Sequence, residues 1–569
     1  YKGGFPSRYG GRASSVIDIY TKDGNNQELK GKFNIGLLNS GFMIESPLTE
    51  KISCFFAARS SYYDLYTISA RREYNQTGTG EYFGYTFYDI NGKINWSVSQ
   101  KNKITLSVFS GHDYQKSVEA VNYSAQKKDA VDKLSIHNTG VSVSQNSVLN
   151  HKVFLKNMIA FSSYNNSMSS RAKFIEYGST RTESLSSFSE INDVTFQSRL
   201  EIYPNNTHSI KTGVEISRYN FVPGLQSSNF ENENAQSEVD TTIGFKTNLS
   251  AFENSFYFED ELSFSNNIKI NLGIRGTNYI CKDTAFYRIE PRLSFRVLIS
   301  EEFSFKANYT LMNHYNHVLV NNEGGFEKEI WLATTKGLLP QRAQQTSVGF
   351  FYSNVLKQLD VSLEGFYKKM SNLLEYRSPT DEADNFDNIE NIVAKNGRGK
   401  SYGLEFQIKK EYQNLSANIN YTLAWNYRKF NELNNGKWFP FVYDRRHDLS
   451  VVAMWKMSDK YSFSSNFSLS SGMPCTLPIG YSATDDYFYH YYIFDEINNR
   501  QLPLYHRLDV VLVRKGKTKK GNTKQFSLNI FNLYARENPV YIYYDSRTGK
   551  VYQKSLFSIV PTISYSVQF

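Results

Sequence analysis

The sequence is poor in cysteine and contains no long apolar run. Its 3 cysteines, Cys54, Cys281 and Cys475, are odd in number, far apart and without CxxC spacing. Such cysteines exclude a disulfide scaffold and a thiolate zinc site. The longest apolar runs, such as residues 54–58 and 451–455, have five residues. A membrane-spanning helix needs about 20 consecutive apolar residues, so the sequence also excludes a helical membrane protein.

Aromatic residues are abundant, whereas histidine is scarce. Tyr, Phe and Trp make up 15% of the 569 residues, histidine contributes 9, and the mean hydropathy is −0.50. Bulky apolar material in this amount argues against disorder. The formal net charge of +9 permits contact with anionic lipid or polysaccharide and does not indicate a nucleic-acid partner. The chain begins at Tyr1 without a signal peptide, so we expect a mature fragment that lacks an N-terminal part.

The dominant signal is an alternation of apolar and polar residues with a period of two, from about residue 28 to residue 569. In residues 286–300, Tyr287, Ile289 and Leu293 stand among apolar odd positions, and the even positions carry three arginines and a glutamate. Neighbouring side chains of a strand point to opposite faces. One face of this strand is therefore apolar and the other is charged.

The length of these strands decides between two all-β architectures. A soluble sandwich also alternates, with strands of about five or six residues. The strands indicated here run about 9 to 15 residues, the length that crosses a bilayer at a tilt. Their polar faces are too densely charged for a protein core and suit a wet or plugged lumen. Because a bilayer forbids open sheet edges, the sequence predicts a transmembrane antiparallel β-barrel of about 22 strands.

The connections between the expected strands alternate between short and long. Outer-membrane barrels have short periplasmic turns and long extracellular loops. We therefore assign the long connections to the extracellular side, near residues 64–83, 115–132, 221–245, 314–343, 376–398 and 472–500.

Several stretches together resemble one family. Near the N-terminus, Tyr-Gly-Gly at 9–11 precedes a short stretch, VIDI, at 16–19. Further stretches are RIEPR at 288–292, YDRRHD at 443–448, IFNLYARENP at 530–539 and the alternating end at Phe569. In this combination the chain resembles a TonB-dependent outer-membrane receptor. The resemblance covers essentially the whole chain and implies two parts, the C-terminal remnant of a plug domain at 1–24 and a barrel with long extracellular loops at 25–569.

The resemblance also implies a function and partners. It implies import of a scarce or bulky ligand, such as a metal chelate, cobalamin, a glycan or a peptide, across the outer membrane of a Gram-negative bacterium. The implied partners are outer-membrane lipid and lipopolysaccharide, the TonB system through an N-terminal region that this sequence lacks, and a surface lipoprotein or other envelope protein. The alternatives are a non-transporting barrel that serves as a platform for surface lipoproteins or envelope-assembly machinery, and an open pore.

Aromatic residues in the long loops are the candidates for ligand binding. Exposed rings can stack on sugars or pack on a partner lipoprotein. The alternative is a loop that packs on itself, or a girdle of rings at the outer membrane interface. The candidates are Trp331, Trp438, Phe439, Tyr487, Tyr489, Tyr491 and Tyr492.

Charged residues at polar positions of the strands are the candidates for the lumen wall. By the parity of the alternation, they face the lumen, where we expect them to anchor the plug rather than to choose the ligand. These wall candidates are Glu253, Glu259, Glu261, Arg288, Glu290, Arg292 and Arg296.

Catalytic and metal-binding patterns are weak. There is no credible pair of nucleophile and base, so we expect no enzyme activity. His314 and His317 have a His-x-x-His spacing without a third ligand nearby, and the acidic stretch 381–390 lacks the order of a calcium loop. We therefore expect neither a metal site nor a cofactor, and a solvated loop at 381–390.

Overall fold

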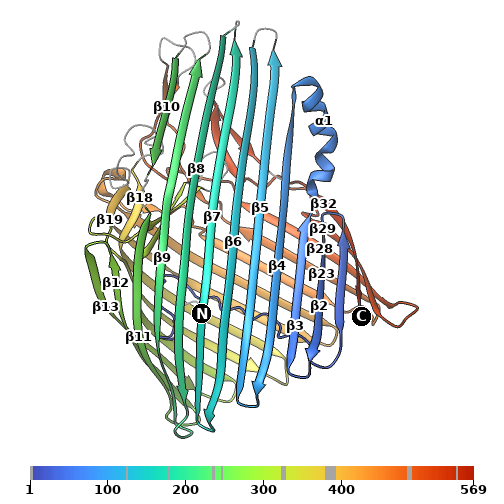
Figure 1. Ribbon diagram of the computed structural model, residues 1–569, viewed down its shortest axis with the longest axis vertical. Coiled ribbons are helices and arrows are strands. Elements are labelled where there is room, and N and C mark those ends of the chain that lie inside the picture. Colours follow the sequence, from blue (N-terminus) through green and yellow to red (C-terminus); the bar gives the residue numbers. More distant parts are fainter. Residues whose placement is uncertain are drawn as a thin grey trace.

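The computed structural model describes residues 4–123, 126–176, 179–232, 237–244, 248–321, 328–377, 393–483, 490–545, 549–555 and 557–569. Its strands form one closed antiparallel barrel (Figure 1). The first barrel strand, β1 (Lys30–Gly36), pairs with both β2 (Asn39–Thr49) and the last strand, β32 (Val560–Gln568). This last pairing leaves no open edge, and the predicted barrel of 22 strands is confirmed.

The other barrel strands follow one another around the barrel in chain order. They are β3 (Ile52–Ser61), β4 (Gly80–Ser99), β5 (Asn102–Tyr123), β6 (Gln126–Asn150), β7 (Val153–Glu176), β8 (Ser179–Ile202), β9 (His208–Asn232), β11 (Leu249–Ser263), β12 (Ile268–Cys281), β13 (Thr284–Leu298), β14 (Phe303–His314), β17 (Gln341–Asn354), β18 (Leu359–Tyr376), β19 (Val393–Tyr412), β20 (Leu415–Lys429), β22 (His447–Trp455), β23 (Tyr461–Ser470), β28 (Tyr505–Lys517) and β29 (Thr523–Phe531).

Short elements occupy the connections at the end with the long loops. They are η1 (Tyr63–Thr67), α1 (Ile68–Thr77), β10 (Ser237–Gly244), β15 (Asn316–Asn321), β16 (Lys328–Ala333), η3 (Asn434–Gly436), β21 (Phe439–Pro440), β24 (Pro474–Cys475), β25 (Gly480–Ala483), β26 (His490–Ile493), β27 (Arg500–Gln501), β30 (Tyr541–Asp545) and β31 (Lys550–Lys554). None of the helices among the described residues combines the length and the apolar character that a membrane-spanning helix requires.

The barrel distributes its apolar and charged side chains in the opposite way to a soluble protein. On β13, Tyr287 and Ile289 point outward and are 72% and 65% exposed. Glu290 and Arg292, at the alternate positions of the same strand, are buried inside the barrel. Apolar side chains outside and charged ones inside are typical of a barrel whose outer face contacts lipid.

One side of the barrel is much taller than the rest. Strands β5 to β9 have 22 to 25 residues each and rise well above strands β11 to β13 (Figure 1). At about 3.3 Å per residue, a strand of this length spans about 80 Å. The expectation of loops at 115–132 and 221–245 is therefore wrong, because most of these residues continue the strands. Above the bilayer both faces of a strand meet water, so the backbone pairing continues without the alternation that marks it in the sequence.

Two other connections are folded rather than open. The connection at 64–83 contains η1 and α1, and the connection at 314–343 forms the hairpin β15–β16. This hairpin turns into the barrel and packs against strands β7, β8, β9 and β18. Leu319, Leu332 and Leu338 are buried by this packing, which accounts for the inward fold.

Two of the family-like stretches form corners where the chain leaves the barrel. In IFNLYARENP, the buried Asn532 has φ +55° and donates its side-chain N–H groups to the carbonyls of Arg536 and Ser558. In YDRRHD, the buried Asp444 accepts the backbone N–H of Asn426 at 2.7 Å and pairs with Arg446 at 3.2 Å. Both stretches satisfy polar backbone groups where strand pairing stops.

Replacement of Ile289 by arginine tests the outward face. A cation on the lipid face near the middle of a strand costs about 2–4 kcal/mol, so Ile289→Arg is expected to lower the free energy of unfolding by that amount. The measurement is urea unfolding of the barrel in lipid vesicles. Val355→Arg is the matched control, because Val355 is 85% exposed in the short turn between β17 and β18. Equal losses in both variants would contradict a lipid-facing Ile289.

Candidate functional site

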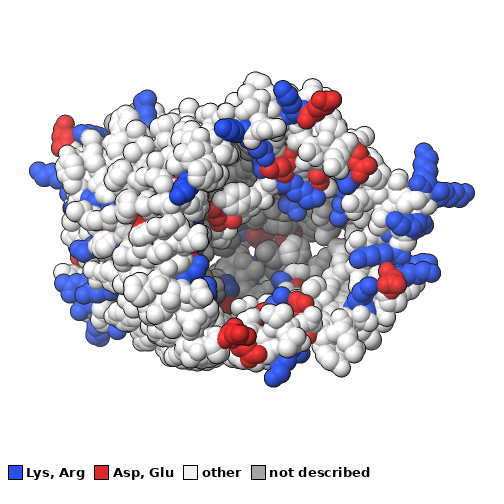
Figure 2. All heavy atoms as spheres, turned by 90° about the horizontal axis from the view of Figure 1, so that it is seen from below, with Lys and Arg blue, Asp and Glu red and all other residues white. Residues whose placement is uncertain are grey.

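Residues 4–29 run along the inside of the barrel. They begin against strands β11 to β14 and end against strands β3 to β5, where β1 starts. The chain trace marked N lies within the outline of the barrel in Figure 1. Figure 2, seen from the end with the short turns, shows a hollow with charged side chains of both signs around it. We call residues 4–29 the lumen segment.

Arg292 on β13 holds the first part of the lumen segment. Its Nη1 donates to the backbone carbonyls of Phe5, Pro6 and Tyr9 at 3.3, 2.7 and 2.5 Å. Its guanidinium lies over the Phe5 ring, 4.5 Å from the ring centroid, and its Nη2 donates to Glu290 at 3.0 Å. Arg292 and Glu290 are both buried, so the pair is shielded from water and sensitive to the loss of either partner.

The glycines at 10 and 11 allow the lumen segment to approach two further charges. A Cβ at Gly10 would lie 2.0 Å from Nε of Arg275, and a Cβ at Gly11 would lie 2.9 Å from Oε1 of Glu253. Gly11 also has φ +63°, a conformation that glycine adopts without strain. The Tyr-Gly-Gly stretch is therefore explained by close packing of the backbone on buried charges.

Ion pairs complete this contact. Arg8 of the lumen segment lies 3.1 Å from Glu259 on β11. Arg275 on β12 lies 2.8 Å from Glu215 on β9 and is fully buried. Buried polar atoms without a hydrogen bond occur in the same cluster, among them Oε1 of Glu253 and Nε of Arg275. Charges therefore hold this part of the interior together with the apolar packing of Phe5 on Met312 and Ala343.

The end of the lumen segment is fixed by two lysines. Asp23 pairs with Lys93 at 2.7 Å and with Lys103 at 2.6 Å. Burial alone would raise the pKa of Asp23, but the hydrogen bonds and charges of the two lysines lower it below its ordinary value. Gly24 follows with φ +84°, and a Cβ there would lie 2.5 Å from the carbonyl oxygen of Cys54. Asp23 and Gly24 therefore fix where the chain turns onto the barrel wall.

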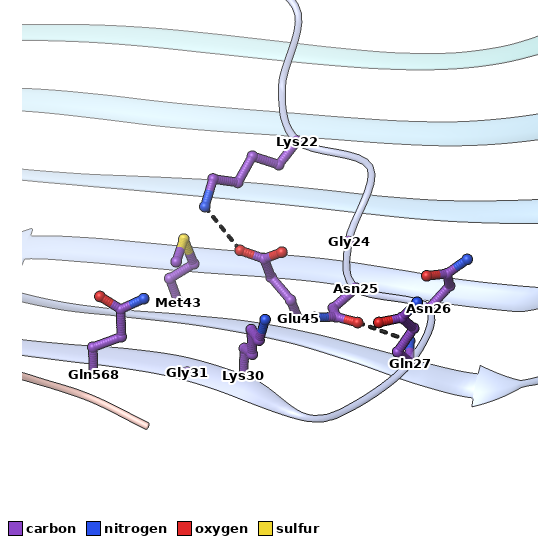
Figure 3. Close-up of a pocket in the computed structure, with 10 residues that line it drawn as sticks. All are labelled: Lys22, Gly24, Asn25, Asn26, Gln27, Lys30, Gly31, Met43, Glu45 and Gln568. Carbon is purple, nitrogen blue, oxygen red and sulfur yellow. Dashed lines mark hydrogen bonds and ion pairs between the residues drawn. The ribbon is translucent and has the colours of Figure 1, made fainter. Parts of the chain in front are cut away.

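A pocket of about 520 Å³ lies where the lumen segment joins β1 (Figure 3). Its lining is polar and comes from residues 22–27 together with β1, β2 and β32. Lys22 crosses it to pair with Glu45 on β2 at 3.0 Å. The pocket is a water-accessible joint between segment and barrel.

The wall candidates fall into two groups. Glu253, Glu259 and Arg292 are buried and lie against the lumen segment, and the buried Glu290 supports Arg292 from the same strand. For the others, the contacts among the described residues are with the barrel itself: Glu261 pairs with Lys269 at 3.6 Å, and Arg288 is exposed and donates to the carbonyl of Tyr287 at 2.9 Å. Arg296 is half-buried.

Two residues of the cluster were missed in the sequence, although the alternation could have found them. Arg275 follows Ile270, Leu272 and Ile274 on β12 at the opposite parity, which places it inside the barrel. Glu215 faces inward on β9 by the same rule, because Val214 and Ile216 are exposed on the outside. The pairing of these two strands with β11 brings both charges to Glu253.

Trp331 lies in the inward hairpin and not on an exposed loop tip. It is half-buried, its ring centroid lies 6.0 Å from that of Tyr164, and its backbone N–H donates to Ser189 on β8 at 3.2 Å. At the base of the hairpin, Tyr315 stacks on Tyr279 of β12 with ring centroids 4.8 Å apart. The hairpin is therefore joined to the inner wall by aromatic contacts.

The histidines of the His-x-x-His spacing lie at this hairpin and are not arranged as metal ligands. Burial lowers the pKa of His317 to about 4, and its ring nitrogens contact Thr334 and Gln341 at 3.1 Å. Among the described residues, no group of three or more His, Cys, Asp and Glu side chains could hold a metal ion.

The remaining aromatic candidates are not brought together in the lumen. Phe439 is buried against Phe430. Trp438 is 42% exposed and lies on Lys400, whose Nζ is 4.5 Å from the ring centroid. Tyr491 and Tyr492 belong to β26, where their backbones pair with Ser482 and Tyr481, and Tyr487 and Tyr489 lie outside the described residues.

Comparison with known proteins identifies the family. The sequence profile described as "TonB dependent receptor-like, beta-barrel" matches residues 20–533. The chain belongs to the TonB-dependent receptor family. The receptor is accordingly a protein of the outer membrane of Gram-negative bacteria. A comparison with curated proteins gave no match.

Solved structures similar to the receptor share its fold at low sequence identity. The ferric-catecholate import receptor Fiu from E. coli K12 has a TM-score of 0.66 and 12% identity, with 100% of this chain and 85% of that chain covered. The siderophore receptor PiuA from Acinetobacter baumannii has a TM-score of 0.68 and 12% identity, with 100% of this chain and 85% of that chain covered. A mutant of the ferric enterobactin receptor PfeA from Pseudomonas aeruginosa has a TM-score of 0.65 and 16% identity, with 100% of this chain and 84% of that chain covered.

Removal of Arg292 is expected to loosen the lumen segment. Arg292→Ala leaves the buried Glu290 without its cation, which costs about 3–5 kcal/mol of unfolding free energy, and removes the three contacts to backbone carbonyls. Limited proteolysis should then cut within residues 4–29 of the folded receptor. Arg288→Ala is the matched control on the same strand, and it should change neither quantity. A resistant segment in Arg292→Ala would contradict the anchoring role.

The two ion pairs of Asp23 predict that the stability of the receptor depends on pH. A carboxyl group with a lowered pKa contributes stability above its ordinary value of 3.8, and this contribution is lost as the pH falls through the lower value in the folded receptor. The stability of the wild type should therefore fall more steeply than that of Asp23→Asn when the pH is lowered through 3.8. The measurement is the unfolding free energy of both proteins at a series of acidic pH values. Parallel curves would show that the two lysines do not make Asp23 contribute to the stability of the receptor.

Proposed function

We propose that the receptor imports a scarce or bulky ligand through a plugged barrel, with energy supplied through TonB. Membership in the family implies interaction with TonB. The observation that carries the proposal is the lumen segment, which is held inside a hollow barrel by buried charges and backbone contacts. We interpret residues 1–24 as the end of a plug and the wall residues as its anchor. We propose no catalytic activity for this arrangement.

Polar anchoring suits a plug that must stay attached while other parts move. Hydrogen bonds and ion pairs are directional, and each is lost sharply once its geometry is broken. An anchor of this type on β11 to β13 and on β4 and β5 fixes both ends of the lumen segment. Movement would then be confined to what lies between or before these anchors. The half-exposed pair at Asp23 is the weaker anchor, because solvent screens it.

For the ligand, we rank a ferric chelate first among the metal chelate, cobalamin, glycan and peptide classes. The support is the likeness to solved structures named as ferric-catecholate, ferric enterobactin and siderophore receptors. At 12–16% identity, this likeness supports the order in which the ligand classes are tested and does not identify the ligand.

A second function, a platform for surface lipoproteins or envelope-assembly machinery, is favoured by one observation. Strands β5 to β9 extend far above the apolar band and form a wall that pore formation does not require. A wall of this height offers a surface for a partner protein. Import and platform functions predict different phenotypes, which makes them separable.

The test is uptake by cells that depend on the receptor. A deletion strain complemented with the native full-length gene is expected to take up one of a panel of labelled ligands, beginning with ferric siderophores. Uptake should stop when TonB is deleted or the proton gradient is collapsed. Cells that take up every ligand normally without the receptor, but lose surface lipoproteins, would support the platform instead.

A further inference from the structure

The outward face of strands β18 to β20 carries a row of stacked aromatic rings. Tyr367, Tyr402 and Trp425 occupy directly opposed positions on the three strands. The ring centroids of Tyr367 and Tyr402 are 6.4 Å apart, and those of Tyr402 and Trp425 are 5.3 Å apart. Tyr367 is 52% exposed on the outside of the barrel. Rows of Tyr and Trp mark the interface between hydrocarbon and headgroups, so this row marks the upper limit of the apolar band.

Four cations stand directly above this aromatic row. Lys369 on β18 is directly opposed to Lys400 on β19, one outward position above the rings. Arg398 on β19 is directly opposed to Lys429 on β20, one outward position higher. Successive outward positions lie about 6–7 Å apart along a strand. We call Lys369, Arg398, Lys400 and Lys429 the outward cation cluster.

No carboxylate balances this cluster within the described part of the chain. None of its four residues forms an ion pair there, and Lys400 instead lies over the rings of Tyr427 and Trp438 at 5.4 and 4.5 Å. By contrast, Arg428, which precedes Lys429 and points inward, pairs with Glu375 at 2.8 Å. Like charges directly opposed on neighbouring strands destabilise a sheet. The geometry therefore calls for an anion between the two cationic pairs.

The place of the cluster indicates which anion is available to it. In the outer membrane, the neighbour of an outward side chain just above the extracellular apolar band is the headgroup of the outer leaflet, which is built from lipopolysaccharide. Its lipid A part carries phosphates at the level of the headgroup. Lysine binds phosphate as a point charge and arginine binds it through two parallel N–H groups. Trp438, which the sequence predicts as a ligand-binding residue of a long extracellular loop, lies beside this cluster, because its ring contacts Lys400.

We propose that the outward cation cluster is a binding site for the phosphates of lipid A. The aromatic row below it contacts the sugar and acyl boundary, and the cations above it bind the phosphates. The site lies on the opposite face of the wall from the lumen and does not depend on the identity of the imported ligand.

The receptor contains a matched control for this site. Lys116 on β5 and Lys133 on β6 are also directly opposed and face outward. They stand eight residues above the apolar outward pair Val108 and Val141 on the same strands, about 26 Å along the strand. This pair has the charge and the cross-strand geometry of Lys369 and Lys400 without their position at the membrane interface.

The experiment measures binding of fluorescent bisphosphorylated lipid A to the purified receptor in detergent micelles. Lys369→Gln/Lys400→Gln should weaken binding about ten-fold or more, and Lys116→Gln/Lys133→Gln should change it by less than about two-fold. Dephosphorylated lipid A should bind the wild type and both variants equally weakly. Inorganic phosphate as a competitor separates recognition of a lipid headgroup from that of free phosphate, and only the former should survive its excess.

Several results would overturn the proposal. Equal binding of lipid A by the wild type and Lys369→Gln/Lys400→Gln would show that the cations have another partner, for example the acidic stretch 381–390, which lies outside the described residues. Equal losses in both double variants would show a general effect of charge. Displacement by inorganic phosphate alone would assign the site to a free anion. Folding of each variant is checked by the difference in gel mobility between heated and unheated samples.

Discussion

Closure of the sheet is the constraint on which the rest of the structure depends. A strand in hydrocarbon cannot leave its backbone groups unpaired, and the pairing of β1 with β32 removes the last open edge. Once the sheet is closed, every strand has one face toward lipid and one toward the lumen. The alternation of side chains then assigns each residue to one of two solvents. Both the anchoring charges inside and the cations outside follow from this assignment.

Buried charges and apolar clusters together hold the interior of the barrel. With apolar residues directed to lipid, the wall offers arginines, glutamates and polar groups to the lumen segment. Burial of ions is costly unless each is paired and hydrogen-bonded. Arg292 has Glu290 and three backbone carbonyls as partners, although its Nε, like Oε1 of Glu253 and Nε of Arg275, is buried without a hydrogen bond.

The alternation predicted the barrel and its strand number because the two solvents differ most within the bilayer. The prediction fails where that difference ends. In residues 115–123 and 126–132, strands β5 and β6 continue without a continuous apolar stripe. The same limit applies to the site: parity indicated Glu253, Glu259, Glu290 and Arg292, but not which of the inward charges meet the lumen segment. That depends on long-range register, such as the pairing that brings Glu215 next to Arg275.

The pair Arg428 and Lys429 shows how the inner charges protect the arrangement of the outer ones. These neighbours point to opposite faces: Arg428 pairs with Glu375 inside, and Lys429 stands opposite Arg398 outside. A slip of one residue in the register of β20 would exchange their faces. It would bring Arg428 outside and leave Glu375, which is half-buried, without its cation. Removing one partner of a shielded ion pair is strongly unfavourable. The inner pair therefore fixes the register that keeps Lys429 above the aromatic row, and the two faces of the wall are not independent.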